Sequence, residues 1–277
     1  MLDGTVGCGG HAAVFLPRIA PNGKYIGLDL DVSILDMARE SLADTPSGVL
    51  YLMCGNYADF PNFLAQVGVS HVNHMLVDLG VNSVQLADPA RGFSFDQDGP
   101  LDMRYSREQS EQALDLVNRL SENELADLFY RFGQEGASRK IAKRICQIRH
   151  TGRIRTTKIL ANAVESVFSS GRVAPRGRVH PATRVFQALR VAVNRELENL
   201  ERFLEQTPEH LAIGGKLAVI SFHSLEDGIV KRFVRRCEAA GTMRELTKRP
   251  LGPDEQERGR NPRSRSAKMR VVERTAV

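Results

Sequence analysis

A glycine-rich loop near the start of the chain is the first feature that could do chemistry. Residues 4–10 read Gly-Thr-Val-Gly-Cys-Gly-Gly, and Gly7, Gly9 and Ala12 satisfy the loose dinucleotide-binding pattern G-x-G-x-x-G/A. Glycines let a backbone approach a ligand closely, and the start of the following helix favours an anionic group. The same residues are also compatible with a tight strand-to-helix turn that holds no ligand.

A carboxylate follows the loop at the expected distance. Asp29 ends the apolar run 24–29, about 20 residues further on, where an acid can accept hydrogen bonds from ribose hydroxyls. Nicotinamide enzymes and methyltransferases share this arrangement. The loop and Asp29 therefore predict a nucleotide-like cofactor without choosing between these two classes.

Two further acids favour methyl transfer. Asp3 precedes the loop, where methyltransferases commonly use an acid to orient the amino-acid part of their cofactor. Asp78-Leu79-Gly80 follows an apolar run, where amino-group methyltransferases place a loop beside the target amine. These positions favour a methyl donor over a nicotinamide.

The charge distribution indicates a polyanionic partner. The chain of 277 residues carries a net charge of +5, but 13 Lys and Arg stand against one acid between Arg139 and Arg190. A second stretch, from Lys231 to Arg274, holds 14 Lys and Arg against 6 acids. Such clusters are typical of nucleic-acid binding, because Lys and Arg contacts to phosphates supply most of the non-specific affinity. The alternative is a solvated basic surface that serves solubility alone.

These residues need a sheet to position them. Hydrophobic patterning predicts strands that alternate with helices at both ends of the chain, which is typical of a doubly wound parallel α/β sheet. The expected strands are 24–29, 49–54, 74–78, 216–222 and 268–274, and the expected helices among them begin at 11 and cover 32–43 and 225–238. Gly214-Gly215 predicts a turn before the strand at 216.

Between these two parts the pattern is helical and basic. A capping box at Ser121–Glu124 opens a helix to about 132. Further helices are expected at 138–150, 157–168 and 181–205, with a mobile basic loop at 171–178. We therefore predict a discontinuous cofactor-binding domain, residues 1–104 and 183–277, interrupted by a helical basic insertion, 105–182, that recognises RNA.

The composition limits the classes of protein to which the chain can belong. The longest apolar runs are too short to span a bilayer, and no secretory signal is visible at the start. The four cysteines are widely scattered without a C-x-x-C pair, which argues against a zinc site and favours a cytoplasmic, reducing compartment. We predict no metal-binding residues.

A series of motifs along the chain resembles the RsmH/MraW family. The first reads Asp-Gly-Thr-Val-Gly-Cys-Gly-Gly-His, and the penultimate reads Asn-Pro-Arg-x-Arg-Ser. In order, the matching segments are 3–11, 78–86, 91–95, 99–104, 180–190, 221–227, 261–266 and 273–274. The resemblance covers essentially the whole chain. Family members carry about two dozen residues before the glycine loop, so we expect this chain to begin inside the first strand.

The resemblance implies an activity and a cofactor. Members methylate N4 of a cytidine in the decoding (P-site) region of 16S rRNA in the small ribosomal subunit, with S-adenosylmethionine bound to a class I, Rossmann-like methyltransferase sheet. Carried over by position, the cofactor contacts are Gly9, Gly10, His11, Asp29, Tyr57, Asp78 and Gln85. Two mild departures are Tyr57, where Phe is usual, and Asn82, where Ser is usual.

The catalytic residues and the RNA-binding residues are hypotheses. Asp102 and His223 could flank the target amine, although His223 could equally be a residue at a helix start that tethers Ser221 and Glu226. Arg184 and Arg190 could reach near the target. The cations expected to hold rRNA phosphates are Arg139, Lys140, Lys143, Arg144, Arg149, Arg153 and Arg155.

Two other functions remain open at this stage. One is an NAD-dependent oxidoreductase, supported by the loop and Asp29 alone. The other is a non-catalytic rRNA-binding or ribosome assembly factor on a decayed methyltransferase fold. The oligomeric state, monomer or homodimer, is also open.

Overall fold

The computed structural model describes residues 1–169 and 180–276 and divides the chain into two compact units. The first unit joins Met1–Gly80 to Leu197–Val277, and the second is Val81–Glu196. Among the described residues, none of the helices combines the length and apolarity that a membrane crossing requires.

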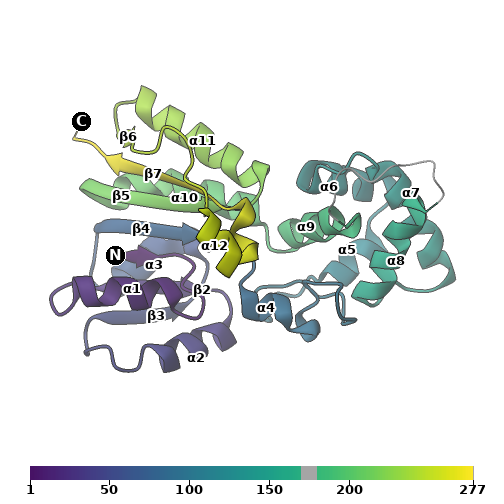
Figure 1. Cartoon of the computed structure of the whole chain (residues 1–277), viewed down its shortest axis with the longest axis horizontal. Coiled ribbons are helices and arrows are strands. Elements are labelled where there is room, and N and C mark those ends of the chain that lie inside the picture. The colour runs from purple at the N-terminus through teal and green to yellow at the C-terminus, as the bar shows by residue number, and fades with distance from the viewer. Residues whose placement is uncertain (170–179, 277) are drawn as a thin grey trace. The chain divides into compact units, whose positions relative to one another are not determined.

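The first unit is built on a seven-stranded sheet (Figure 1). The strand order is β3-β2-β1-β4-β5-β7-β6, and β7 is antiparallel to both of its neighbours while β1 to β5 are parallel. The strands are β1 (Leu2–Asp3), β2 (Tyr25–Asp29), β3 (Leu50–Cys54), β4 (Val72–Asp78), β5 (Leu211–Ser221), β6 (Met243–Glu245) and β7 (Lys268–Arg274). This order, with its reversed seventh strand, is that of a class I methyltransferase sheet.

Helices cover both faces of this sheet because alternate strand residues are apolar on both sides. Tyr25 packs with α1 (Gly10–Ile19) and α2 (Val32–Ser41), whereas the next residue, Ile26, packs into the core that holds the other helices. Those helices are α3 (Phe60–Gln66), α10 (Glu196–His210) and α11 (Ser224–Ala239). A strand that is apolar on both faces is the expected pattern of a parallel sheet.

The structure refines one predicted strand. Strand β5 begins at Leu211 rather than at 216, and the predicted Gly214-Gly215 turn lies inside it as an irregularity. Gly214 has a φ of 74°, and the register with β4 shifts between the Val72–Leu211 and His74–Lys216 pairs. The Gly214-Gly215 pair therefore forms a bulge within a strand. Sequence patterning alone does not distinguish such a bulge from a turn that precedes a strand.

The second unit is helical and has its own apolar core. Its elements are α4 (Ser83–Ala87), η2 (Pro89–Arg91), α5 (Ala113–Arg119), α6 (Glu122–Gly133), α7 (Ser138–Thr151), α8 (Thr157–Phe168) and α9 (Ala182–Val193). Phe93, Leu101 and Met103 are buried in the same core as these helices. This packing places the unit's boundaries at 81 and 196, outside the predicted 105 and 182.

The predicted helix 181–205 is wrong as a single element. Helix α9 ends at Val193, Arg195 adopts a left-handed φ of 51°, and α10 starts at Glu196. The Asn194 amide causes the break, because it donates to the carbonyls of Met103 and Arg190 and accepts the N–H of Tyr105. No glycine or proline marks this position. The predicted basic loop at 171–178 lies outside the described residues.

Candidate functional site

Three acids lie at the carboxyl ends of three neighbouring strands of the first unit. Asp3 ends β1, Asp29 ends β2 and Asp78 ends β4. Strand β1 lies between the other two, so the chain winds outward in opposite directions from this point. Open α/β sheets bind ligands at such a switch point, outside the carboxyl ends of the strands.

The glycine loop connects β1 to α1 at the same edge. Gly9 precedes α1 with a φ of 90°, and a Cβ there would lie 2.9 Å from a methyl group of Leu42. The positive φ favours glycine, and the close approach to Leu42 disfavours a side chain at this position. Gly10 opens the helix into free space, since a Cβ at this position would meet no atom within 4 Å. No side chain caps the start of α1, so the N–H groups of its first turn are available to a ligand.

Asp29 is held by the loop that it faces. Its Oδ2 accepts the Gly7 N–H at 3.1 Å, and its Oδ1 accepts the Asp31 N–H at 3.0 Å. Burial nevertheless raises the pKa of Asp29 to about 6, because desolvation outweighs these two hydrogen bonds. Each oxygen retains a lone pair for a further donor, such as a ribose hydroxyl.

Asp3 is fully buried and anchored on two sides. Its Oδ2 accepts the Tyr25 hydroxyl at 2.5 Å, and its Oδ1 accepts the Thr5 N–H at 3.1 Å. Desolvation raises the pKa of Asp3 in spite of the Tyr25 and Thr5 hydrogen bonds, which act in the opposite direction. The Thr5 hydroxyl in turn accepts the Asp78 N–H at 2.7 Å, so β1 and β4 are linked at the site.

The Asp78 carboxylate has an unused oxygen. Its Oδ1 is buried and has no hydrogen-bond partner among the described residues. Desolvation raises the pKa of Asp78 to about 6, while the charge of His11 lowers it and those of Asp3 and Glu226 raise it. A buried acceptor without a partner costs stability. This oxygen is therefore suited to a donor from a ligand.

The electrostatics of this edge favour a cationic ligand. Burial raises the pKa values of Asp3, Asp29 and Asp78, and the pKa values of Asp29 and Asp78, about 6, leave both mostly ionised at neutral pH. His11 is the side chain whose electrostatic effect lowers the pKa values of Asp3 and Asp78. A pyrophosphate would be repelled here, whereas a sulfonium or ammonium group would be attracted. The site therefore fits S-adenosylmethionine better than it fits NAD.

Tyr57 lies close to the loop. A Cβ on Gly4 would lie 2.9 Å from the Tyr57 Cβ, and the Tyr57 ring packs edge-on against Phe203 at 5.5 Å between centroids. The side chain is half-buried. Its position on η1 (Tyr57–Asp59), shortly after β3, keeps it among the predicted cofactor residues.

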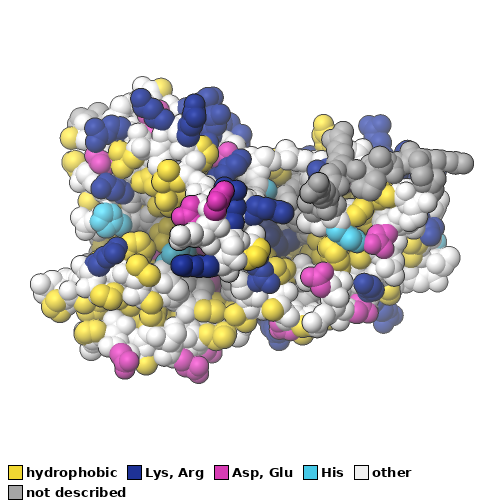
Figure 2. Space-filling model, in the orientation of Figure 1, with side chains coloured by type: hydrophobic (Ala, Val, Ile, Leu, Met, Phe, Trp, Pro, Cys, Tyr) yellow, Lys and Arg dark blue, Asp and Glu magenta, His cyan; other side chains and the backbone are white. Residues whose placement is uncertain are grey.

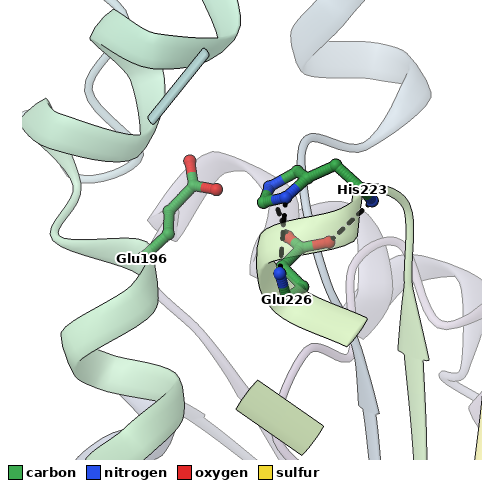
Figure 3. A group of neighbouring side chains, drawn as sticks. All are labelled: Glu196, His223 and Glu226. Atoms are coloured by element: carbon green, nitrogen blue, oxygen red, sulfur yellow. Dashed lines mark hydrogen bonds and ion pairs between the residues drawn. The ribbon is translucent and has the colours of Figure 1, made fainter. Parts of the chain in front are cut away.

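His223 forms a tight unit with Glu226 at the start of α11 (Figure 3). The His223 Nδ1 accepts the Glu226 N–H at 3.4 Å, and its Nε2 lies 3.1 Å from Glu226 Oε1. The second oxygen of Glu226 accepts the N–H groups of Phe222 at 2.8 Å and His223 at 3.2 Å. His223 is thus a helix N-cap as well as a side chain at the carboxyl end of β5. The third residue drawn, Glu196, belongs to the second unit, where it pairs with Arg190.

Two predicted site residues lie in the second unit. Gln85 is buried and forms a capping box with Asn82, with the Gln85 N–H donating to Asn82 Oδ1 at 2.8 Å. Both oxygens of Asp102 accept from the Arg104 guanidinium, at 2.7 and 2.8 Å. Burial alone would raise the pKa of Asp102, but the Arg104 hydrogen bonds and charge lower it.

The predicted RNA-binding cations of the second unit divide into two groups. Arg139, Lys140, Lys143 and Arg155 are exposed. Arg144 and Arg153 are also exposed, but Arg144 donates to Ser166 and Arg153 donates to Asp115 at 3.4 Å. By contrast, Arg149 donates to the carbonyls of Val117 and Leu120 at the end of α5. Arg190 pairs with Glu196 through two hydrogen bonds, and Arg184 lies 3.8 Å from Glu135. Arg149, Arg184 and Arg190 therefore make contacts within the second unit.

Comparison with known proteins decides the family. The model of the MraW methylase family matches residues 1–275. The chain belongs to the MraW methylase family. Similar curated proteins are the ribosomal RNA small subunit methyltransferases H of Sorangium cellulosum and Coprothermobacter proteolyticus, 47% and 44% identical over 273 residues. In each case the match covers 99% of this chain, and it covers 84% and 89% of the two relatives.

A solved structure is also similar to this MraW-family chain. The rRNA methylase of Streptococcus thermophilus aligns with 8% identity and a TM-score of 0.42, covering 99% of this chain and 86% of that one. Because this structural similarity is low, we assign the fold from the strand order. Family membership and strand order together confirm three predictions: a class I α/β sheet, methyltransferase activity, and S-adenosylmethionine as the methyl donor.

Two site residues were missed by sequence reasoning. Tyr25 and Thr5 hold Asp3 in place. Both are ordinary strand and loop residues whose contacts depend on the fold. The alternative prediction that His223 tethers Glu226 at a helix start agrees with the capping box that these two residues form.

Proposed function

We propose that this methyltransferase acts on small-subunit ribosomal RNA and transfers a methyl group to the exocyclic N4 of a cytidine in the decoding region of 16S rRNA. The observation that carries the proposal is the buried, unpartnered Asp78 Oδ1 in an acid-rich edge of a class I sheet. The names of the relatives support small-subunit rRNA as the substrate. The motifs from 78 to 86 and from 221 to 227 support an amino group as the acceptor. A cytoplasmic location follows from this substrate.

The residues at the sheet edge fit the cofactor. In our proposal Asp29 accepts the ribose hydroxyls, Gly9 and Gly10 leave space for the methionine part, and His11 lies beside it. Tyr57 offers a ring near the adenine. Asp78 Oδ1 accepts from a donor of the ligand. Gln85 is the remaining predicted cofactor contact. When bound, S-adenosylmethionine supplies an electrophilic methyl group.

The protein's main contribution to the reaction is orientation. The cytosine amine is a weak nucleophile because its lone pair is conjugated into the ring. An acceptor for one N4–H would localise that pair, and the loop 78–81 is positioned for this. Holding the two reactants in line can supply on the order of 7–11 kcal/mol. The base must also be unstacked, which costs a few kcal/mol unless it is already single-stranded.

Asp102 and His223 remain the proposed groups beside the amine. The Glu226 N–H donates to Nδ1 of the His223 ring, and the buried Glu226 carboxylate lies 3.1 Å from its Nε2. The two oxygens of Asp102 already accept from Arg104, so this acid supports the turn 99–104 in any case. His223 is therefore the better candidate for contact with the amine.

The exposed cations of the second unit support an RNA substrate. Arg139, Lys140 and Lys143 lie on the exposed face of α7, and no acid lies between Arg139 and Glu165. We propose that this helical unit recognises rRNA through its phosphates.

Nucleoside analysis tests the proposal. The protein is incubated with labelled S-adenosylmethionine and small ribosomal subunits that lack this modification, and the rRNA is then digested. N4-methylcytidine is the expected product. Methylation at N3 or C5 of cytidine would contradict the chemistry, and absence of any product would favour a non-catalytic assembly factor.

Calorimetry tests the cofactor site directly. S-adenosylhomocysteine should bind and NAD should not. Asp29→Asn should weaken S-adenosylhomocysteine binding about 10-fold to 150-fold, because hydrogen bonds to charged groups contribute about 1.5–3 kcal/mol. Asp36→Asn, an exposed acid of α2 paired with Arg39, is the matched control and should bind normally. Equal effects of the two substitutions would remove Asp29 from the site.

A further inference from the structure

The segment between β6 and β7 crosses the functional edge of the sheet. Strand β6 runs parallel to β5, and β7 returns antiparallel to both. The last residue of β5, Ser221, pairs with the first residue of β7, Lys268. Residues 246–267 therefore leave β6 toward the carboxyl edge and enter β7 at that edge, beside His223. We call residues 246–267 the strap.

The strap is held in a defined conformation. The backbones of Leu251 and Met269 exchange two hydrogen bonds, at 2.9 and 2.8 Å, and the Leu246 N–H donates to Val271. Buried Arg270 ties the adjoining strand to Asp227 at 2.7 Å and to Glu245 at 3.2 Å. Within the strap, the Arg258 guanidinium donates to the carbonyl of Pro253. Side chains on the strap are thus presented from a fixed backbone.

The charges on the strap are segregated. Its three acids, Asp254, Glu255 and Glu257, lie at the start of α12 (Glu255–Arg260). From Arg258 to Lys268 the sequence holds five Lys and Arg and no acid. The side chains of Arg260 and Arg265 are exposed and make no hydrogen bond or ion pair with the described residues. Lys and Arg side chains are visible on and beside α12 in Figure 2.

We infer that the strap is a second RNA-binding surface, located on the methyltransferase unit itself, in which Arg260 and Arg265 contact phosphates next to the target nucleotide. This inference deepens the proposed function and rests on it. A phosphate ligand fits because exposed arginines on a fixed backbone, close to the edge where the base must enter, can bind phosphate bidentately. Neither the helical unit nor the cofactor site uses these residues.

The test is the salt dependence of binding to unmethylated small subunits and to protein-free 16S rRNA. The Arg260→Gln/Arg265→Gln variant should lower the slope of log K against log salt by about 1.4–1.8, since each phosphate contact contributes about 0.7–0.9. At about 0.1 M salt this corresponds to about 25-fold to 60-fold weaker binding. The Arg260→Lys/Arg265→Lys variant should retain most of the slope.

A matched control removes the same charge elsewhere on the first unit. Lys231 and Arg235 are exposed on α11, which runs away from the carboxyl edge. Lys231→Gln/Arg235→Gln should keep the wild-type slope. Equal slopes for the two double variants would overturn the inference. A loss confined to assembled subunits would also overturn it, because the partner would then be a ribosomal protein.

Failure of the inference and failure of the proposed function are separable. The salt slope is measured without catalysis, whereas the product nucleoside is identified with the wild-type protein. Wild-type formation of N4-methylcytidine with an unchanged slope for the arginine variant would reject the strap alone. In a turnover assay the variant should raise KM for the subunit, leave kcat nearly unchanged and bind S-adenosylhomocysteine normally.

Discussion

The Tyr25 hydroxyl donates a 2.5 Å hydrogen bond to the buried Asp3 carboxylate, and this contact fixes the acid that ends β1. The hydrogen bond lowers the pKa of Asp3 against the larger effect of desolvation. Tyr25 thus acts on the site without lying on the loop. The same interaction, together with burial, raises the pKa of the Tyr25 hydroxyl, so this group stays a donor.

Tyr25→Phe should destabilise the protein and weaken cofactor binding. The substitution leaves a buried carboxylate oxygen without its donor, which costs about 1–3 kcal/mol of the free energy of unfolding. Chemical denaturation measures this loss. Tyr51→Phe, on the neighbouring strand β3, removes a hydroxyl for which no hydrogen bond is found among the described residues, and is the control. If both variants lose the same stability, the Tyr25 hydrogen bond contributes nothing.

Asp78→Asn should stabilise the cofactor-free protein while weakening cofactor binding. Burial raises the pKa of Asp78 from 3.8 to about 6, so the folded state binds a proton that the unfolded state releases between these values. The ionised carboxylate therefore reduces stability above pH 6, and this cost fades as the pH falls toward 4. We expect Asn to add about 1–3 kcal/mol at pH 7.5 and nothing near pH 4.

Denaturation at the two pH values checks this prediction, with Asp36→Asn as a substitution of an exposed acid. A stability gain that is the same at both pH values would show that the charge of Asp78 is not its cause. Unchanged binding of S-adenosylhomocysteine by Asp78→Asn would show that Oδ1 does not serve the cofactor.

Two substitutions, His223→Ala and Asp102→Ala, distinguish a catalytic role from a structural role. If His223 lies beside the amine, its loss should lower kcat about 100-fold, within the range of side chains that assist proton movement. Asp102→Ala should in addition lower stability, because it releases the Arg104 guanidinium from both oxygens. Steady-state kinetics and calorimetry with S-adenosylhomocysteine are the measurements. Unchanged turnover with intact cofactor binding would remove both residues from the mechanism.

Neutralising exposed cations of α7 should weaken RNA binding without affecting the cofactor. Replacing Arg139, Lys140 and Lys143 by Gln should lower the salt slope by about 2, at about 0.7 per contact. Arg149→Gln should behave differently, because this arginine binds the carbonyls of Val117 and Leu120. We expect it to lower stability and to leave the slope nearly unchanged. A wild-type slope for the triple variant would contradict the role of α7.

The sequence predicted most strands and the site acids because both depend on local patterns. The ends of β2 and β4 were readable, since an apolar run that stops at Asp29 or Asp78 marks both the strand and its acid. Helices α7 and α8 were readable from their periodicity. The short strand β6 and α12 were not predicted, because neither has a periodic apolar pattern long enough to detect.

Features that depend on distant contacts could not be read in this way. The break at Arg195 is produced by Asn194 reaching Met103 and Tyr105, about ninety positions away in the chain. The support of Asp3 by Tyr25 depends on the pairing of β1 with β2. The limits of the helical unit likewise depend on where residues such as Phe93 are buried.

The position of β7 inside the sheet has a consequence for biosynthesis. Residues 268–274 fill the space between β5 and β6, so β5 has no partner on that side until this stretch has been translated. A product of premature termination before Lys268 would expose the unpaired edge of β5 along 216–221, an apolar strand. Such edges promote aggregation. A nonsense or frameshift mutation late in the reading frame should therefore yield insoluble protein rather than a partly active enzyme.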